Sequence, residues 1–283
     1  MSLFILIIAG YSYWNYLYPH LPNNLRQTLF EGITYIREVR HTPRPIIIHV
    51  VTVDLSHPNI RFLVTPGKVT ENGEIGARTT SQFLSEFKQQ IAVNGSFFHP
   101  FSEKVWNPYP RQTGDPLYVL GLASNQGKVY SQAQNQFKTL YLTADNQASF
   151  QAPMGAVYNA ISGRDLFLKQ GKLQAPFINA LPNKPPYPRT AFALDKTAKT
   201  LMIFVVDGKQ KNYSEGVTMI ELAEIVQAYG GDTALNMDGG GSSTLVMADV
   251  AGEPILLNSP IHARFRGNER LVANHLGISV QRE

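Results

Sequence analysis

The sequence predicts a single α+β domain in which two principal helices pack on a mixed or antiparallel β-sheet. Many short apolar runs rich in β-branched residues are bounded by turn residues, which is typical of strands. Only two segments combine a helical apolar period with clear end signals. The elements do not alternate strictly between strand and helix, as a doubly wound fold would require. Of the 283 residues, 43% are hydrophobic and 16% charged, which excludes a disordered chain.

Both helices are expected to begin at a capping box, one at Thr79 with Gln82 and the other at Thr218 with Glu221. Apolar residues on one helical face follow each box: Phe83, Leu84, Phe87 and Ile91 in the first helix, and Met219, Leu222, Ala223, Val226 and Tyr229 in the second. The pair Gly230-Gly231 supplies a stop signal for the second helix.

The expected strands begin with the apolar run PIIIHVVTVDL at residues 45–55, and residues 59–65 are interpreted as its partner. Residues 190–194 and 201–206 flank the turn sequence DKTAKT and predict a hairpin. Further short strands are expected at these positions: 117–123, 128–129, 138–143 and 165–168.

The N-terminal residues 1–20 form a hydrophobic segment that we interpret as an export signal or uncleaved membrane anchor. Residues 3–10 are wholly apolar and aromatic residues continue to position 18, which is close to the roughly 20 residues of a membrane span. The protein is therefore expected to be exported, with a possible membrane tether through residues 3–18. A buried N-terminal strand is the alternative. Residues 21–44 are expected to be a linker with one short helix around 25–36, and residues 45–283 the folded domain.

The charge pattern favours small anionic substrates over nucleic acid. The net charge of +4 arises from 25 basic and 21 acidic residues, without a long basic run. The chain contains no cysteine, which excludes disulfides, zinc thiolates and cysteine nucleophiles. The histidines at 49, 57, 99, 262 and 275 lack metal-ligand spacing, so we predict no zinc site and no cofactor. A hard cation held by Asp207 or Asp238 remains an open alternative.

The stretch TALNMDGGGSSTLVM, residues 233–247, is the strongest candidate for a functional site. An apolar run leads into Asp238, followed by Gly239, Gly240 and Gly241 and then by Ser242 and Ser243. Adjacent glycines contribute nothing to a packed core, but they allow the backbone to approach another group closely and to present N–H donors to an anion. A hairpin turn does not require this pattern.

Two other polar residues, Asn94 and Asp207, also follow apolar strand-like runs. Asn94 stands in VNGSFF and Asp207 in VVDGK, and either sequence alone is also compatible with an ordinary turn. Loops at strand ends commonly carry catalytic groups, so we expect Asn94, Asp207 and Asp238 to converge. Arg189, at the start of an apolar strand, is either a structural ion-pair member or an anion-binding group.

Seven segments in chain order together resemble the phosphodiester glycosidase family: NGSFF, ISG, RTAFALD, VVDGK, SEGVTMIELAEIVQAYG, ALNMDGGGSST and ERLVANHLGI. The resemblance covers roughly residues 46–280. It implies cleavage of a sugar-1-phosphodiester between the anomeric carbon and the bridging oxygen. The transition state then has oxocarbenium character that a carboxylate stabilises. The leaving phosphate monoester, with a second pKa of about 6, needs little protonation but benefits from fixed positive charge and N–H donors.

On this basis Asp238 is expected to act at the anomeric centre as base or nucleophile. Asp207 is the second catalytic candidate, positioning water or protonating the bridging oxygen. The expected substrate-binding residues are Asn94, Arg189, Gly239, Gly240, Gly241, Ser242 and Ser243. The substrate is expected to be a carbohydrate phosphodiester from cell-envelope or exopolysaccharide material.

Two alternatives remain open at this stage. The first is a carbohydrate-binding or polysaccharide-assembly module that keeps the cleft without turnover, which a pocket with Asp238 turned away would favour. The second is a glycoside hydrolase acting on linkages without phosphate, which would require a well-placed acid beside the leaving oxygen.

Overall fold

The computed structural model describes residues 20–68, 74–100, 109–175 and 185–281. The expected N-terminal signal or anchor, apart from His20, lies outside these residues. No helix within the described ranges is long and apolar enough to cross a membrane. The fold is mostly β, with two main helices and a single domain, so the α+β expectation holds in a β-rich form. Every strand-to-strand ladder in the described part of the chain is antiparallel.

The largest sheet has eight strands in the order β1-β2-β3-β17-β16-β18-β14-β15. Their bounds are β1 Leu25–Phe30, β2 Ile33–Arg40, β3 Ile46–Asp54, β14 Leu166–Lys169, β15 Lys172–Leu173, β16 Arg189–Asp195, β17 Thr200–Val206 and β18 Gly231–Asn236. The predicted hairpin is confirmed, because β16 and β17 pair in register from Arg189 with Val206 to Leu194 with Leu201.

Two five-stranded sheets lie beside it, in the orders β20-β19-β6-β23-β4 and β10-β9-β13-β11-β12. The first comprises β4 Ile60–Val64, β6 Ile91–Asn94, β19 Leu245–Ala248, β20 Pro254–Leu256 and β23 His275–Val280. The second comprises β9 Ala123–Asn125, β10 Lys128–Ser131, β11 Lys138–Leu142, β12 Ala148–Ser149 and β13 Asn159–Gly163. The smaller sheets comprise β5 Ile75–Gly76, β7 Phe98–Pro100 and β8 Pro116–Val119, and the hairpin of β21 Ile261–His262 with β22 Phe265–Arg266.

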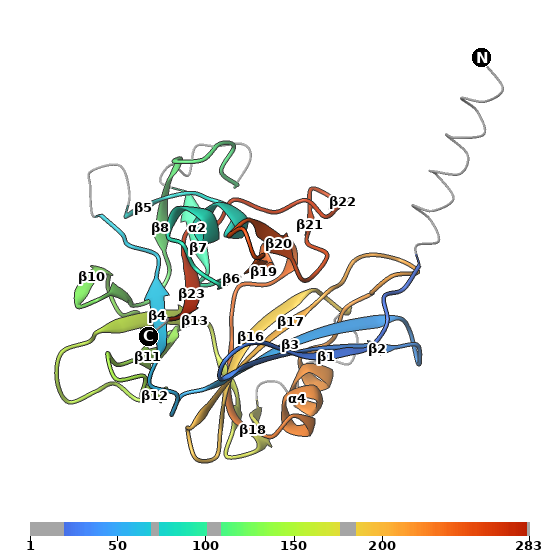
Figure 1. Cartoon of the computed structure of the whole chain (residues 1–283), viewed down its shortest axis with the longest axis horizontal. Helices are drawn as coiled ribbons and strands as arrows, with labels where there is room; N and C mark the ends of the chain where they lie inside the picture. Colours follow the sequence, from blue (N-terminus) through green and yellow to red (C-terminus); the bar gives the residue numbers. More distant parts are fainter. Residues whose placement is uncertain (1–19, 69–73, 101–108, 176–184, 282–283) are drawn as a thin grey trace.

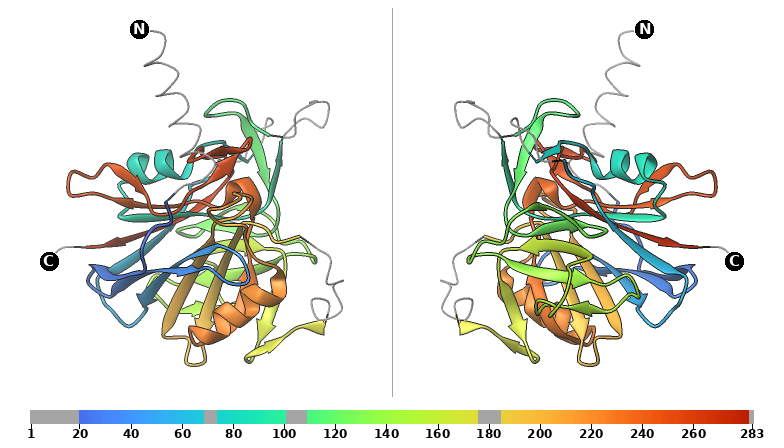
Figure 2. Two further views of the ribbon diagram at one scale, coloured as in Figure 1. Left: turned by 90° about the vertical axis from the view of Figure 1, so that its right-hand side faces the viewer. Right: turned by 90° about the vertical axis from the view of Figure 1, so that its left-hand side faces the viewer.

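The eight-stranded sheet is covered on both faces. Along β3, Ile46, Ile48 and Val50 pack toward the buried residues of helix α4, Met219–Ala228, while Val51 and Val53 join a second core with strands of the five-stranded sheets. This alternation is the period of two that a strand imposes on its side chains. Figures 1 and 2 show α4 lying across one face of the β16–β17 region.

The other main helix, α2, Thr80–Glu86, covers the sheet that contains β6 and β19. Its buried Phe83 and Leu84 pack with Ala92 and Val246 on the side away from the large sheet. In both figures α2 lies on the opposite side of the molecule from α4. The layers therefore run from α4 through the large sheet and a five-stranded sheet to α2. Both predicted capping boxes are confirmed, at Thr79 and at Thr218.

Three local predictions are wrong. The segment expected as a helix around residues 25–36 is the β1–β2 hairpin, so the large sheet begins inside the expected linker. The strand β4 pairs with β23 near the C-terminus and not with β3. Ile91 does not continue the first helix but begins β6. The residues that follow β6, β17 and β18 nevertheless form the candidate site.

Candidate active site

Of the three polar residues at strand ends, Asn94 contacts Asp238 directly, and Asp207 is linked to the loop after Asp238 through Asn258. Asn94 ends β6, and its Nδ2 donates to the backbone oxygen of Asp238, 2.7 Å away. The Asn94 Oδ1 accepts from Thr244 N at 3.1 Å and from Thr190 Oγ1 at 2.9 Å. Asn94 is fully buried, so its contacts fix the backbone of the loop that starts at Asp238.

Asp238 combines a desolvated carboxyl with a nearby cation. Burial raises its pKa to about 6, opposed by the Ser242 hydroxyl, by the positive charge of Arg270 and by the Gly239 N–H. The residue as a whole is partly exposed. A carboxyl with a pKa in this range is mostly ionised at neutral pH while remaining able to accept a proton, which suits a base or nucleophile.

A side chain at any of the three glycines that follow Asp238 would meet a close neighbour. A Cβ on Gly239 would lie 2.8 Å from Pro188 O, and one on Gly240, whose φ is +66°, would lie 2.7 Å from the Tyr187 ring. A Cβ on Gly241 would lie 2.5 Å from Arg270 Nη2. The Gly240 N–H donates to Pro188 O, so it is not the free anion donor that the sequence led us to expect. The N–H groups of Ser242 and Ser243 donate to Gly239 O and Gly240 O.

Arg270 supplies fixed positive charge beside this loop. Its Nη1 donates to Ser242 Oγ at 3.2 Å and its Nε to His262 Nδ1 at 3.3 Å, while its guanidinium lies 4.0 Å from the Tyr109 ring centre. Burial and the charge of Arg270 lower the pKa of His262, which is consistent with a neutral imidazole accepting this bond. Among the described residues Arg270 makes no ion pair.

Asp207 is held inside a buried polar network. Its carboxylate accepts from Asn258 Nδ2 at 2.9 Å and from Ser259 N at 2.9 and 3.1 Å, and its Oδ2 lies 3.1 Å from His49 Nε2. Asn258 also donates to Ser243 O, which joins Asp207 to the glycine-serine loop. The side chain of Asp207 is completely buried. Through Asn258, these contacts fix the backbone of the glycine-serine loop at Ser243.

The backbone of Arg189 lies near the glycine loop, and its side chain lies near the Tyr187 ring, which packs on that loop. Its Nε donates to Val217 O at 3.3 Å, and its guanidinium lies 5.5 Å from the Tyr187 ring centre. The Lys209 ammonium lies 3.8 Å from the same ring, which packs on Gly240. Desolvation by burial lowers the pKa of Arg189. The positive charge that acts on the Asp238 carboxyl is that of Arg270.

A hollow of about 970 Å³, here called the basic hollow, opens beside Gly241 and Arg270. Asp238 is not one of its lining residues. The Asp238 carboxyl bonds to the Ser242 hydroxyl, which accepts from Arg270, and Arg270 lines the hollow. Its lining residues are Tyr109, Lys209, Gln210, Lys211, Asn212, Gly241, Ile261, His262, Ala263, Arg264, Arg266 and Arg270. Five of them are lysine or arginine and none is acidic. The hollow is therefore suited to an anion.

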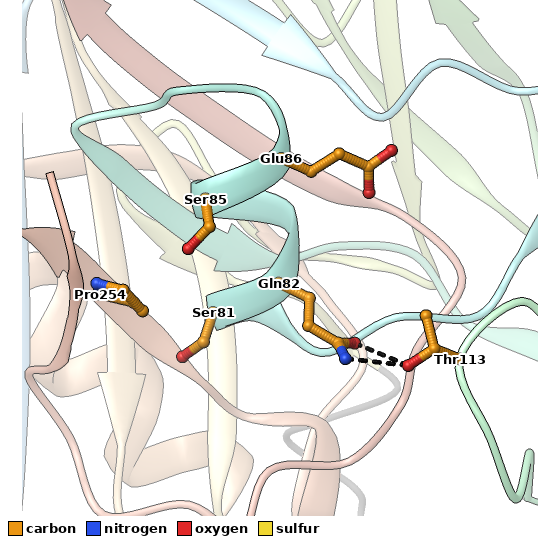
Figure 3. A pocket seen from close by; sticks show the side chains of 6 residues that line it. All are labelled: Ser81, Gln82, Ser85, Glu86, Thr113 and Pro254. Carbon is orange, nitrogen blue, oxygen red and sulfur yellow. Dashed lines mark hydrogen bonds between the residues drawn. The ribbon is translucent and has the colours of Figure 1, made fainter.

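A second hollow, of about 500 Å³, lies on helix α2 away from these residues. Figure 3 shows Ser81 and Ser85 pointing toward Pro254, and Gln82 bonded to Thr113. Its one charged lining residue, Glu86, pairs with Arg78. This hollow lacks the cations found at the basic hollow and contains none of the predicted site residues.

The described residues contain no group of three histidine, aspartate or glutamate side chains that could hold a metal ion. Within the ranges given above, the oxygens of Asp207 already accept N–H donors from protein groups. Nothing in the donor set favours a cation at Asp207.

Sequence reasoning missed Arg270, Tyr187, His49 and Asn258. Arg270 falls inside the segment ERLVANHLGI, and Lys209 inside VVDGK, but no local spacing marks either as a site residue. Asn258 and His49 carry no sequence signal for a role at Asp207. Their contacts depend on strands that are distant in the sequence.

Comparison with known families finds a match over most of the chain. The profile of the phosphodiester glycosidase family matches residues 87–279, which is about two thirds of the chain and includes Asn94, Asp207, Asp238 and Arg270. The chain belongs to the phosphodiester glycosidase family. The activity of this family is that of a glycosidase hydrolase. No curated protein matches the sequence.

Solved structures share the phosphodiester glycosidase fold at low sequence identity. The catalytic domain of zebrafish N-acetylglucosamine-1-phosphodiester alpha-N-acetylglucosaminidase, auto-inhibited by its pro-peptide, is 19% identical with a TM-score of 0.60, covering 92% of this chain and 88% of that one. A Synechocystis protein is 14% identical with a TM-score of 0.55, and 92% of this chain is covered. This chain spans 64% of the length of the Synechocystis protein.

Proposed function

We propose that this protein hydrolyses sugar-1-phosphodiesters at the bond between the anomeric carbon and the bridging oxygen. The observation that carries the proposal is the link from Asp238 through Ser242 to Arg270. It places one carboxyl, with its pKa raised to about 6, beside a fixed guanidinium at the edge of a basic hollow. A glycosyl phosphate needs both groups, one at the sugar and one at the phosphate. Membership of the family supports the same reaction.

The chemistry follows from these positions. The bond from the anomeric carbon to the bridging oxygen breaks, and its electron pair leaves with the phosphate, whose charge Arg270 stabilises. A water oxygen bonds to the anomeric carbon, and its proton passes to Asp238 or to solvent. In a two-step reaction, Asp238 Oδ first bonds to the anomeric carbon and water then displaces it. The leaving phosphate monoester is a weak base, so no strong acid is required beside it.

The remaining site residues support this centre. Asn94 holds the Asp238 backbone, and Asp207 braces the loop through Asn258 and Ser243. We assign both a positioning role, because their polar atoms are already used within the chain. The Ser242 hydroxyl is buried and connects the Asp238 carboxyl to Arg270, so we assign it a positioning role as well.

The substrate belongs, in our proposal, to cell-envelope or exopolysaccharide material, and the protein acts outside the cytoplasm. The apolar run at residues 3–10 supports export through a signal or anchor.

A donor screen tests the function. The full chain is incubated with a panel of sugar-1-phosphodiesters that differ in sugar and aglycone, and release of free sugar is measured. We expect at least one donor to be cleaved and D238N to lose roughly 100-fold or more of that turnover while remaining folded. D165N, at a partly exposed carboxylate, is the matched control. Binding of donors without release would favour a carbohydrate-binding module, and cleavage of alkyl glycosides alone would favour an ordinary glycoside hydrolase.

A further inference from the structure

The basic hollow contains more positive charge than one scissile phosphate needs. Besides Arg270 it is lined by Lys209, Lys211, Arg264 and Arg266, which together are five of the 25 basic residues of the chain. Lys211 and Arg264 are exposed and, within the described ranges, neither forms an ion pair. Among the described residues no acidic side chain lines the hollow, so the like charges of Lys211 and Arg264 repel one another, and a ligand that neutralises them best explains their position.

Four residues, two on each of two walls of the hollow, have a positive φ, which residues other than glycine rarely adopt. Lys209 and Asn212 on one wall have φ of +57° and +64°, and Ala263 and Arg264 on the other have φ of +53° and +67°. Ala263 and Arg264 form the two-residue turn between β21 and β22, where asparagine and glycine are the preferred residues. Left-handed non-glycine residues of this kind cost roughly 1–3 kcal/mol each and cluster at functional sites.

The wall formed by Lys209, Lys211 and Asn212 is also braced against the chain. The Gln210 Nε2 donates to Ser259 O at 2.7 Å, and Ser259 Oγ lies 3.0 Å from Gln210 Oε1. The Gln210 and Ser214 backbones exchange hydrogen bonds across the same loop. The cationic side chains therefore project from fixed positions, which reduces the entropy lost when they bind an anion.

We propose that the basic hollow is the aglycone subsite and that the natural aglycone carries a second phosphate group. The substrate class is then a sugar-1-phosphodiester whose aglycone is itself phosphorylated, as in a polymer of repeating phosphodiester units. Arg270 contacts the scissile phosphate, and Lys211 and Arg264 contact the next one. This inference rests on the proposed function for its reaction. The anion-binding part does not depend on turnover.

A binding experiment tests the subsite without any reaction. Inorganic tripolyphosphate and orthophosphate are titrated by calorimetry into the full chain, into K211Q/R264Q and into the control K128Q/K196Q. Both doubles remove two exposed charges, and the control pair lies in β10 and the β16–β17 turn. We expect tripolyphosphate to bind more tightly than orthophosphate and K211Q/R264Q to weaken it roughly tenfold. The control should change it less than twofold. Equal effects of the two doubles would overturn the subsite.

A kinetic experiment tests the substrate class. Two donors share one sugar-1-phosphate and differ only in carrying glycerol or glycerol phosphate as the aglycone. We expect the phosphorylated aglycone to give roughly tenfold higher kcat/KM at low salt, and we expect K211Q/R264Q to remove that preference. Cleavage of both donors without preference would overturn the second phosphate and leave the proposed function standing. Anion binding that follows the Lys211 and Arg264 charges, without cleavage of any donor, would overturn the proposed function alone.

Discussion

The guanidinium of Arg270 lies so close to Gly241 that a single added carbon at Gly241 would stand 2.5 Å from Nη2. No positive φ is recorded for Gly241, so its backbone does not by itself require glycine. What requires glycine is the space that Arg270 occupies next to Ser242 and the basic hollow. The absence of a side chain at Gly241 thus leaves the space in which the guanidinium of Arg270 lies.

G241A is accordingly expected to reduce activity without unfolding the protein. The added methyl displaces the flexible end of Arg270, so kcat/KM on a cleaved donor should fall at least tenfold, because a fixed charge at the leaving phosphate is lost. The free energy of unfolding should change by no more than about 1 kcal/mol. G155A is the matched control, since a Cβ there would meet nothing within 4 Å. Full activity of G241A would remove Arg270 from the site.

Replacement of Asp207 is expected to act mainly on stability. In D207N the amide oxygen can still accept from Asn258 Nδ2 and Ser259 N, but the amide NH2 then replaces the carboxylate oxygen that lies 3.1 Å from His49 Nε2, and the charge that holds these buried donors is lost. We expect the free energy of unfolding in urea to fall by about 2–4 kcal/mol. D165N, at a partly exposed carboxylate, should change it by less than about 0.5 kcal/mol. A fully stable D207N without turnover would instead support a catalytic Asp207.

The fall in activity at acid pH should follow the protonation of the Asp238 carboxyl. Because burial raises its pKa to about 6 and the base or nucleophile must be ionised, kcat/KM is expected to fall tenfold per unit as pH drops below about 6. Between about pH 7 and 8 the ionisation of Asp238 should no longer change kcat/KM. The measurement is kcat/KM across pH on a single donor. Activity that rises as pH falls from 6 to 4 would make Asp238 an acid.

The three site positions at strand ends could be predicted from the sequence because each comes at the end of a mainly apolar run. Asn94 is the last residue of β6, Asp207 directly follows β17, and Asp238 comes two residues after β18. Asn94 bonds to Asp238, and Asp207 is linked to the same loop through Asn258. The glycines after Asp238 also signalled a close approach. Which groups approach them could not be predicted, because Tyr187 and Arg270 come from distant parts of the chain.

The segment 25–36 shows why other predictions from the sequence were wrong. Its apolar residues fit a short helix, but Ile33 and Tyr35 are buried on one face at the period of two, and Gly32, with a φ of +71°, turns the chain between β1 and β2. A short apolar run fits both the helical period and the strand period, so the segment with which it can pair decides which structure forms. Here that partner is β3, with which β2 pairs over its whole length.

D238N is expected to stabilise the fold increasingly as pH rises. The pKa of Asp238 is about 6 in the folded protein against an ordinary value of 3.8, so between these values the folded state binds more protons than the unfolded state. The contribution of this group to the free energy of unfolding is therefore greatest below about pH 4 and is lost as pH rises through about 6. D238N cannot ionise and avoids this loss. Urea unfolding at about pH 4, 5, 6 and 7 should show the difference between D238N and the original protein growing with pH. A difference for D238N that shrinks with pH would mean that the folded protein favours the charged carboxylate, and the placement of a desolvated carboxyl at this site would be wrong.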